Sequence, residues 1–169
     1  MDNLITENLI ALDIDLPDKA AVINEIGDRL FANARVIDRE KFIKDIYARE
    51  EITSTGLEDL IAIPHARSAA VSTASLVYLR LKSPIQWNKE QQARYIFGIA
   101  VPEDNTNNIH LKILSSVARK LVADEVKQII VESNSKQTIL DSSSKCDRII
   151  TKEYLIRGGK IKAFPWAMV

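Results

Sequence analysis

Residues 60–65 read Leu-Ile-Ala-Ile-Pro-His, four apolar residues followed by a proline and a histidine. A short, continuous apolar run that stops at a proline is typical of a buried strand. We therefore expect a strand at 60–63, with His65 just past its carboxyl end. Side chains at such strand ends are where α/β proteins tend to place their ligands.

The segments around this strand alternate between helix and strand patterns. Residues 75–81 and 94–101 are rich in Val, Ile, Leu and Tyr, which indicates two more strands, and Ser83-Pro84 indicates a loop between them. Asp18 and Asp38 are the expected N-caps of the first two helices. Interleaved helices and strands predict an α/β (α+β) fold, a single domain with a mixed central β-sheet flanked by helices. Helical spacing of apolar residues predicts helices at 18–34, 39–51, 108–122, 124–132 and 136–142.

The composition excludes several classes of protein. The chain has 169 residues, with 23 Lys+Arg balanced by 23 Asp+Glu, so its zero net charge argues against a nucleic-acid binder. No apolar run approaches the roughly 18 residues of a membrane span, and the first residues do not form a signal peptide. A single cysteine, Cys146, excludes a disulfide framework and an all-cysteine metal site. These features predict a cytoplasmic location.

The last 25 residues differ in charge from the rest. Residues 145–169 carry six basic and two acidic side chains, a net charge of +4, so residues 1–144 must sum to −4. Gly158-Gly159 stands between two short β-prone runs, which is a hairpin signal. We expect a domain at 1–144 and a basic C-terminal extension at 145–169, either a β-hairpin or disordered.

The two histidines of the chain both occupy places where chemistry is favoured. His65 has an imidazole that is a competent nucleophile near neutral pH, because its ordinary pKa is about 6.5; the alternative is a histidine that only hydrogen-bonds at a strand end. His110 lies in the first turn of the predicted helix 108–122, where free N–H groups favour anions. Its alternative role is a partly buried histidine satisfied by the backbone.

Further donors for an anion precede the strand. Arg49 borders the inward stripe of its helix and offers forked donors to a phosphoryl group, unless its stem merely packs on the core. Ser54, Thr55 and Gly56 follow in a loop and add hydroxyl and backbone N–H donors. The sequence has no phosphate-binding glycine motif of the nucleotide-binding folds and no cluster of zinc ligands. It therefore predicts neither a metal nor a cofactor.

Taken together, these motifs resemble a known family. Arg49-Glu50, Ser54-Thr55-Gly56 and the run Ile61–Ala66, followed by His110–Ser115 with Ala118, resemble the enzyme IIA (EIIA) domains of the fructose–mannitol class, type 2. These domains belong to the bacterial phosphoenolpyruvate-dependent sugar phosphotransferase system (PTS). The resemblance covers roughly residues 1–144. The glycine-rich run of many members is reduced here to Thr-Gly-Leu-Glu-Asp-Leu at 55–60.

The resemblance implies that the chain is a phosphotransferase. His65 would accept a phosphoryl group from the carrier protein HPr and pass it to a cysteine of the IIB component, with Arg49 and His110 in the active site. Ser54, Thr55 and Gly56 would add phosphate contacts, and the sugar would be met only through the IIC permease. The alternative is a regulatory IIA-type module, in nitrogen or transcription control, that acts by phosphorylation-dependent protein binding. Small residues after the histidine (Ala66, Ala69, Ala70 and Val71) would form either an apolar docking rim, as one helical turn, or ordinary core.

Overall fold

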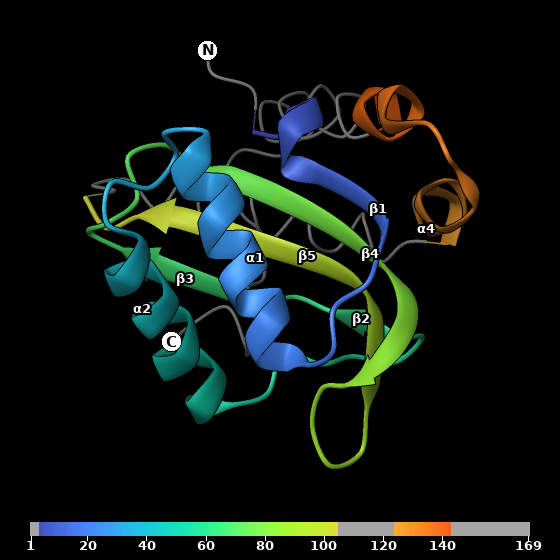
Figure 1. Cartoon of the computed structure of the whole chain (residues 1–169), viewed down its shortest axis with the longest axis horizontal. Coiled ribbons are helices and arrows are strands. Elements are labelled where there is room, and N and C mark those ends of the chain that lie inside the picture. The colour runs from blue at the N-terminus through green and yellow to red at the C-terminus, as the bar shows by residue number, and fades with distance from the viewer. Residues whose placement is uncertain (1–3, 105–123, 143–169) are drawn as a thin grey trace, which may run out of the picture. The chain divides into compact units, whose positions relative to one another are not determined.

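The computed structural model describes residues 4–104 and 124–142 (Figure 1). The contacts divide the chain into two compact units, Met1–Thr106 and Asn107–Val169, a division that falls inside the predicted domain 1–144. The predicted helix 108–122, with His110, and the predicted extension 145–169 lie outside the described residues. Among the residues described, no helix is both long and apolar enough to cross a bilayer.

Two helices of the first unit begin where the sequence predicts. Helix α1 spans Lys19–Ala32 and helix α2 spans Arg39–Ile52. The carboxylate of Asp18 accepts a hydrogen bond from the Ala21 N–H at 2.8 Å, and that of Asp38 accepts one from the Lys41 N–H at 3.0 Å. Each cap satisfies a backbone donor that the first helical turn leaves unpaired. The prediction of both helices and both caps is confirmed.

The sheet of the first unit is mixed, and its strands follow the order β1-β4-β5-β2. Strands β4 and β5 form a long antiparallel hairpin, while β1 runs parallel to β4. Strands β2 and β3 both run parallel to β5. The α/β fold with a mixed sheet is thus confirmed. The strands are β1 (Ile10–Ile14), β2 (Ile61–Ala62), β3 (His65–Ser68), β4 (Ser75–Gln86) and β5 (Gln92–Pro102).

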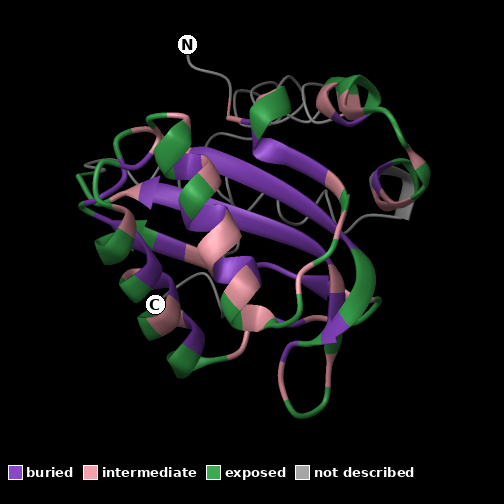
Figure 2. Cartoon of the chain, in the orientation of Figure 1, coloured by how far each residue is buried: buried purple, intermediate pink, exposed green. Residues whose placement is uncertain are grey.

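Helices α1 and α2 lie side by side on one face of this sheet (Figure 1), with α1 against β4 and α2 against β3. Their inward side chains are fully removed from solvent, and Figure 2 shows the buried stripe along both helices and the strands behind them. This packing fixes the carboxyl end of α2 near the start of β3. The residues of the two buried stripes include Val22, Ile23, Ile26, Leu30, Phe42 and Ile46.

Two local expectations are wrong. Ser83-Pro84 is not a loop between strands but lies within β4, at a break in register with β5 between Arg80 and Ile85, where a proline is tolerated. The prediction that His65 follows a strand is confirmed, since β2 ends at Ala62, and His65 is itself the first residue of the next strand, β3. The residues after it form no helical turn, since Ala66 continues β3 and pairs with Ala100.

Two elements near the N-terminus escape the sequence analysis. A short 3-10 helix, η1, spans Glu7–Leu9 and leads into the edge strand β1. Only the first two residues of β1, Ile10 and Ala11, are buried, so the strand lacks the apolar run that marks β4 and β5. Its pairing partner Tyr78 lies far along the chain.

The described part of the second unit is helical. Helix α4 spans Asp124–Glu132, and residues 136–142 form a further helical segment. Both helices are confirmed where the apolar spacing predicts them. Ile130 and Ile139 are their buried residues, each about 1 % exposed.

Candidate phosphoryl-transfer site

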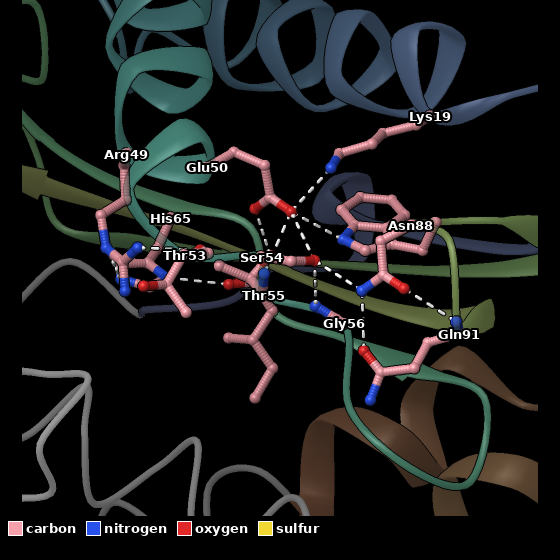
Figure 3. A network of polar contacts seen from close by, with 12 residues as sticks. Lys19, Arg49, Glu50, Thr53, Ser54, Thr55, Gly56, His65, Asn88 and Gln91 are labelled. Carbon is pink, nitrogen blue, oxygen red and sulfur yellow. Dashed lines mark hydrogen bonds and ion pairs between the residues drawn. The ribbon is translucent and has the colours of Figure 1, made fainter.

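Arg49 and His65 meet although they come from different elements. Arg49 lies in the last turn of α2 and His65 opens β3. The Arg49 Nε donates to the His65 Nε2 at 3.1 Å, and the Arg49 Nη1 donates to the Thr53 carbonyl at 3.1 Å. Figure 3 shows the guanidinium lying against the imidazole. The structure therefore brings together two of the residues that the sequence singled out.

The contact with Arg49 defines the protonation state of the imidazole. A guanidinium can only donate, so the His65 Nε2 must accept with its lone pair. The proton of the neutral ring is then on Nδ1, which lies 2.8 Å from the Ile63 carbonyl oxygen and donates to it. The ring is thus held at both nitrogens, with its nucleophilic lone pair directed toward the arginine.

The surroundings of His65 favour its neutral form. Burial lowers the pKa of the half-buried imidazole below its ordinary value of 6.5, because a charged ring is poorly solvated there. The hydrogen bond to Ile63 opposes this shift, while the positive charge of Arg49 adds to it and the negative charge of Glu50 counters it. The net lowering of the pKa leaves His65 uncharged near pH 7, as a nitrogen nucleophile must be.

Glu50 is the centre of the polar network beside this pair. The residue as a whole is only 8 % exposed. Oε1 accepts hydrogen bonds from Lys19 Nζ at 2.7 Å, Trp87 Nε1 at 2.9 Å and the Thr55 N–H at 3.0 Å. Oε2 accepts one from the Thr55 hydroxyl at 2.5 Å. Burial alone would raise the pKa of Glu50, but the hydrogen bonds from Lys19 and Thr55 outweigh it and hold that pKa below its ordinary value.

The hydrogen-bond donors of the predicted phosphate-binding loop pair with other groups of the protein. The hydroxyl and the N–H of the buried Thr55 both donate to Glu50. The Ser54 hydroxyl donates to Glu50 at 3.2 Å and accepts from Asn88 Nδ2 at 2.8 Å, and the Gly56 N–H donates to that same hydroxyl at 3.3 Å (Figure 3). The loop formed by residues 53–56, here called the site loop, is therefore anchored by these contacts.

The tip of the β4–β5 hairpin closes over the site loop. Gly56 packs so tightly against it that a Cβ at this position would lie 2.8 Å from Trp87 Cδ1 and 2.9 Å from Gln91 Oε1. Asn88 joins the hairpin to the site loop, because its Nδ2 donates to the Ser54 hydroxyl and, within the hairpin, to Gln91 Oε1, each at 2.8 Å. Sequence reasoning missed Lys19, Trp87, Asn88 and Gln91. A tryptophan directly before the turn residue Asn88 is the one sequence signal that could have indicated them.

In the described part of the chain, the side chains that commonly bind metals form no cluster. Residues 4–104 and 124–142 contain no group of three or more His, Cys, Asp or Glu side chains placed to hold an ion. Since His110 lies outside these ranges, the site as described consists of Arg49, His65, Glu50 and the site loop.

Comparison with known sequences identifies relatives over most of the chain. Residues 3–145 match the family described as "Phosphoenolpyruvate-dependent sugar phosphotransferase system, EIIA 2". The chain is 32% identical over 147 residues to the PTS system fructose-specific EIIABC component of Bacillus subtilis, covering 86% of this chain but only 23% of that protein. It is 32% identical over 135 residues to the PTS system fructose-specific EIIA component of Haloferax volcanii, covering 79% of this chain and 87% of that protein. The chain thus spans about a quarter of the first relative and most of the second.

Solved structures with the same fold include two EIIA proteins. The nitrogen regulatory protein IIA-Ntr of Neisseria meningitidis superposes with a TM-score of 0.73 at 25% identity, covering 83% of this chain and 96% of that one. The IIA mannitol protein of Escherichia coli gives a TM-score of 0.67 at 23% identity, covering 82% of this chain and 98% of that one. The second likeness supports the fold alone.

Proposed function

Because the chain belongs to the EIIA type 2 family of the phosphoenolpyruvate-dependent sugar phosphotransferase system, we propose that His65 carries a phosphoryl group between two proteins of that system. The donor is phospho-HPr and the acceptor is a cysteine of a IIB component, both in the cytoplasm. The observation that carries this assignment is the 3.1 Å contact between Arg49 Nε and His65 Nε2, which pairs a neutral nucleophile with a cationic donor.

The first step forms a bond between His65 Nε2 and the phosphorus of the donor's phosphohistidine. The P–N bond of the donor breaks, and its electron pair stays on the donor's ring nitrogen. His65 keeps its proton on Nδ1, where the Ile63 carbonyl accepts it, so no proton has to leave. In the second step a IIB thiolate attacks the same phosphorus, and the electron pair of the P–N bond returns to Nε2.

Arg49 supplies positive charge where the transition state needs it. Phosphoryl transfer proceeds through a loose transition state with negative charge spread over three equatorial oxygens, so positioning and fixed donors provide most of the catalysis. The Arg49 guanidinium already lies at the nitrogen that becomes phosphorylated. When the phosphoryl group enters, the forked donors of Arg49 turn from His65 Nε2 to the phosphoryl oxygens. His110 is proposed as the second donor, on the resemblance of its sequence context.

The transfer domain is proposed to span residues 1–144, with the basic segment 145–169 as an extension. The family match over residues 3–145 supports this boundary. The sugar would meet only the IIC permease, so no sugar site is assigned to this chain. Ser54, Thr55 and Gly56 retain a place in the site, but their observed contacts favour positioning over direct phosphate binding.

A regulatory role is the second candidate. The likeness to the nitrogen regulatory protein of Neisseria meningitidis, at 25% identity over 83% of this chain, favours it. A regulator would hold the same phosphohistidine but use it to change its binding to another protein. The fructose-specific relatives of Bacillus subtilis and Haloferax volcanii, each 32% identical, favour the transport role.

Reconstitution of phosphoryl transfer tests the proposal. The chain is incubated with phosphoenolpyruvate, enzyme I and HPr, and its phosphorylation is followed by intact mass. The wild-type protein is expected to gain one phosphoryl group, and H65A none. Subsequent loss of the group to a fructose-type IIB protein supports the transport role, whereas retention of the group favours the regulator. Phosphorylation of H65A at the wild-type rate would overturn the assignment of His65.

A further inference from the structure

We propose that Glu50 is a positioning residue, whose carboxylate closes a ring of hydrogen bonds that sets the tautomer and orientation of His65. This inference rests on the proposed function, because it assigns a role in that transfer to a residue that does not touch the phosphoryl group. Figure 3 shows the carboxylate lying between the site loop and Lys19, one residue along α2 from Arg49.

The first side of the ring runs from Glu50 through the site loop to the imidazole. The carboxylate takes both polar hydrogens of Thr55, at 3.0 Å from its N–H and 2.5 Å from its hydroxyl. The Thr55 carbonyl then accepts from the Ile63 N–H at 3.0 Å. The Ile63 carbonyl in turn accepts from His65 Nδ1 at 2.8 Å. Thr55 and Ile63 therefore connect the Glu50 carboxylate to the Nδ1 proton that defines the tautomer of His65.

The second side of the ring runs through the helix itself. Arg49 precedes Glu50 in the last turn of α2 and donates to His65 Nε2. Its Nη1 is held by the carbonyl of Thr53, which is part of the same site loop. The two nitrogens of the imidazole are thus held from opposite sides, and Glu50 is where the two sides meet.

The position of Glu50 is fixed from outside the ring. Lys19 of α1 donates to Oε1 at 2.7 Å, and its ammonium lies 4.9 Å from the centre of the Trp87 ring. The Trp87 Nε1 donates to the same oxygen at 2.9 Å. These contacts connect α1, α2 and the β4–β5 hairpin at one buried carboxylate. Because a charged carboxylate accepts from all these donors and a neutral amide accepts at one oxygen only, glutamine cannot replace it.

The test separates a positioning role from a merely structural one. Four variants are compared with the wild type: E50Q, which removes the charge; T55V, which removes the hydroxyl but keeps the shape; T55S, which restores the hydroxyl; and E51Q, the matched control at an exposed neighbour. One readout is the rate of phosphorylation by phospho-HPr. The other is the ¹⁵N shifts of the two His65 ring nitrogens, assigned by comparison with H65A, in the unphosphorylated protein.

The wild type is expected to show a protonated Nδ1 and an unprotonated Nε2, with clearly separated shifts. In E50Q and T55V the two shifts should converge, because both tautomers become populated, and phosphorylation should slow on the order of 10- to 100-fold. T55S and E51Q should match the wild type in both readouts. If E50Q does not fold, the T55V variant tests the inference instead, because it keeps the ion pair between Glu50 and Lys19.

Two results would overturn the inference while leaving the proposed function intact. One is unchanged His65 shifts in folded E50Q or T55V, whatever the rate. The other is a wild-type rate in both variants. Phosphorylation of H65A would instead overturn the proposed function, so the two failures are distinguishable.

Discussion

Arg49 Nε lies 3.1 Å from His65 Nε2, and this one contact couples the last turn of α2 to the first residue of β3. A guanidinium carries only N–H donors and no acceptor atom, so the contact assigns the lone pair to His65 Nε2 and the proton to Nδ1. The same guanidinium is the nearest described cation to the nitrogen proposed to bind phosphorus. In the proposed transfer, the pair would therefore combine orientation of the nucleophile with stabilisation of the transition state.

Replacing Arg49 should slow transfer and raise the pKa of His65. R49Q removes the positive charge that would stabilise the phosphoryl oxygens, so phosphorylation by phospho-HPr should fall on the order of 100-fold. Since the charge of Arg49 contributes to lowering the pKa of His65, the same variant should raise that pKa, measured by NMR titration. R29Q, a change in α1, is the control. A normal rate in R49Q would contradict the role of Arg49.

The lowered pKa of His65 predicts how transfer and stability depend on pH. Because the native pKa lies below 6.5, the proposed nucleophile loses its lone pair to a proton only at lower pH than an ordinary histidine, so the midpoint of the decline in acceptance rate should lie below pH 6.5. Below pH 6.5 the unfolded chain takes up a proton that the native imidazole resists. The free energy of unfolding should therefore decrease as pH falls through this window, and it should decrease less steeply in H65Q. A decline in rate with its midpoint above pH 6.5 would contradict this assignment.

A methyl group at residue 56 should disturb the site loop. In G56A the added Cβ would meet Trp87 Cδ1 at 2.8 Å, and the buried indole is held in place by Glu50. We expect a loss of about 1–3 kcal/mol in the free energy of unfolding, measured in urea, together with slower phosphorylation.

G27A is the matched control for this change. Its Cβ would also meet a side chain at 2.8 Å, that of Ile43, but at the interface of α1 and α2 rather than at the site loop. The gain in helix propensity, about 1 kcal/mol, offsets part of the clash. Transfer should therefore stay normal in G27A, and equal rates in both variants would count against the proposed close packing of the site loop.

A partly buried ion pair elsewhere in the sheet should affect stability but not transfer. Arg80 is only 3 % exposed and donates twice to the Asp13 carboxylate, at 2.8 Å each. D13N leaves the guanidinium without its charged partner, while asparagine tolerates the left-handed backbone at this position (φ 54°). Because Asp13 is half exposed, we expect D13N to lower the free energy of unfolding by about 1–2 kcal/mol at pH 7, which is less than for a fully buried pair.

The same pair should respond to acid. The hydrogen bond from Arg80 lowers the pKa of Asp13 below 3.8, so the stabilisation is present above that pH and is lost as pH falls through the lowered pKa. The difference in free energy of unfolding between D13N and the wild type should become smaller at strongly acidic pH. The exposed D15N is the control, and a D13N protein as stable as the wild type at pH 7 would contradict the role of the pair.

Sequence patterns predicted what is local in this fold. The two helices and their Asp18 and Asp38 caps depend on residues within one or two turns, so periodicity and capping chemistry identify them. Strand β1 escaped because its pairing with β4 is remote and only its first two residues are buried. Ser83-Pro84 was predicted as a loop because proline usually interrupts a strand. A strand that continues through a break in register has no sequence pattern that distinguishes it from such a loop.

The site was predictable only in part for the same reason. Arg49 and His65 were each candidates, but spacing alone cannot place two side chains 16 residues apart in contact. Glu50 belongs to the Arg49-Glu50 motif, but no local pattern indicates its role, because its partners Lys19 and Trp87 are 31 and 37 residues away. Packing of α1, α2 and the hairpin, rather than any local pattern, makes this carboxylate a centre of hydrogen bonds.

The most direct test of the account is to locate the phosphorus on the protein. After phosphorylation by phospho-HPr with ¹⁵N-labelled histidine in the chain, ³¹P–¹⁵N coupling identifies the bonded nitrogen, and peptide mapping at alkaline pH identifies the residue. The account predicts phosphorus on Nε2 of His65. Phosphorus on Nδ1 of His65, or on His110, would contradict it.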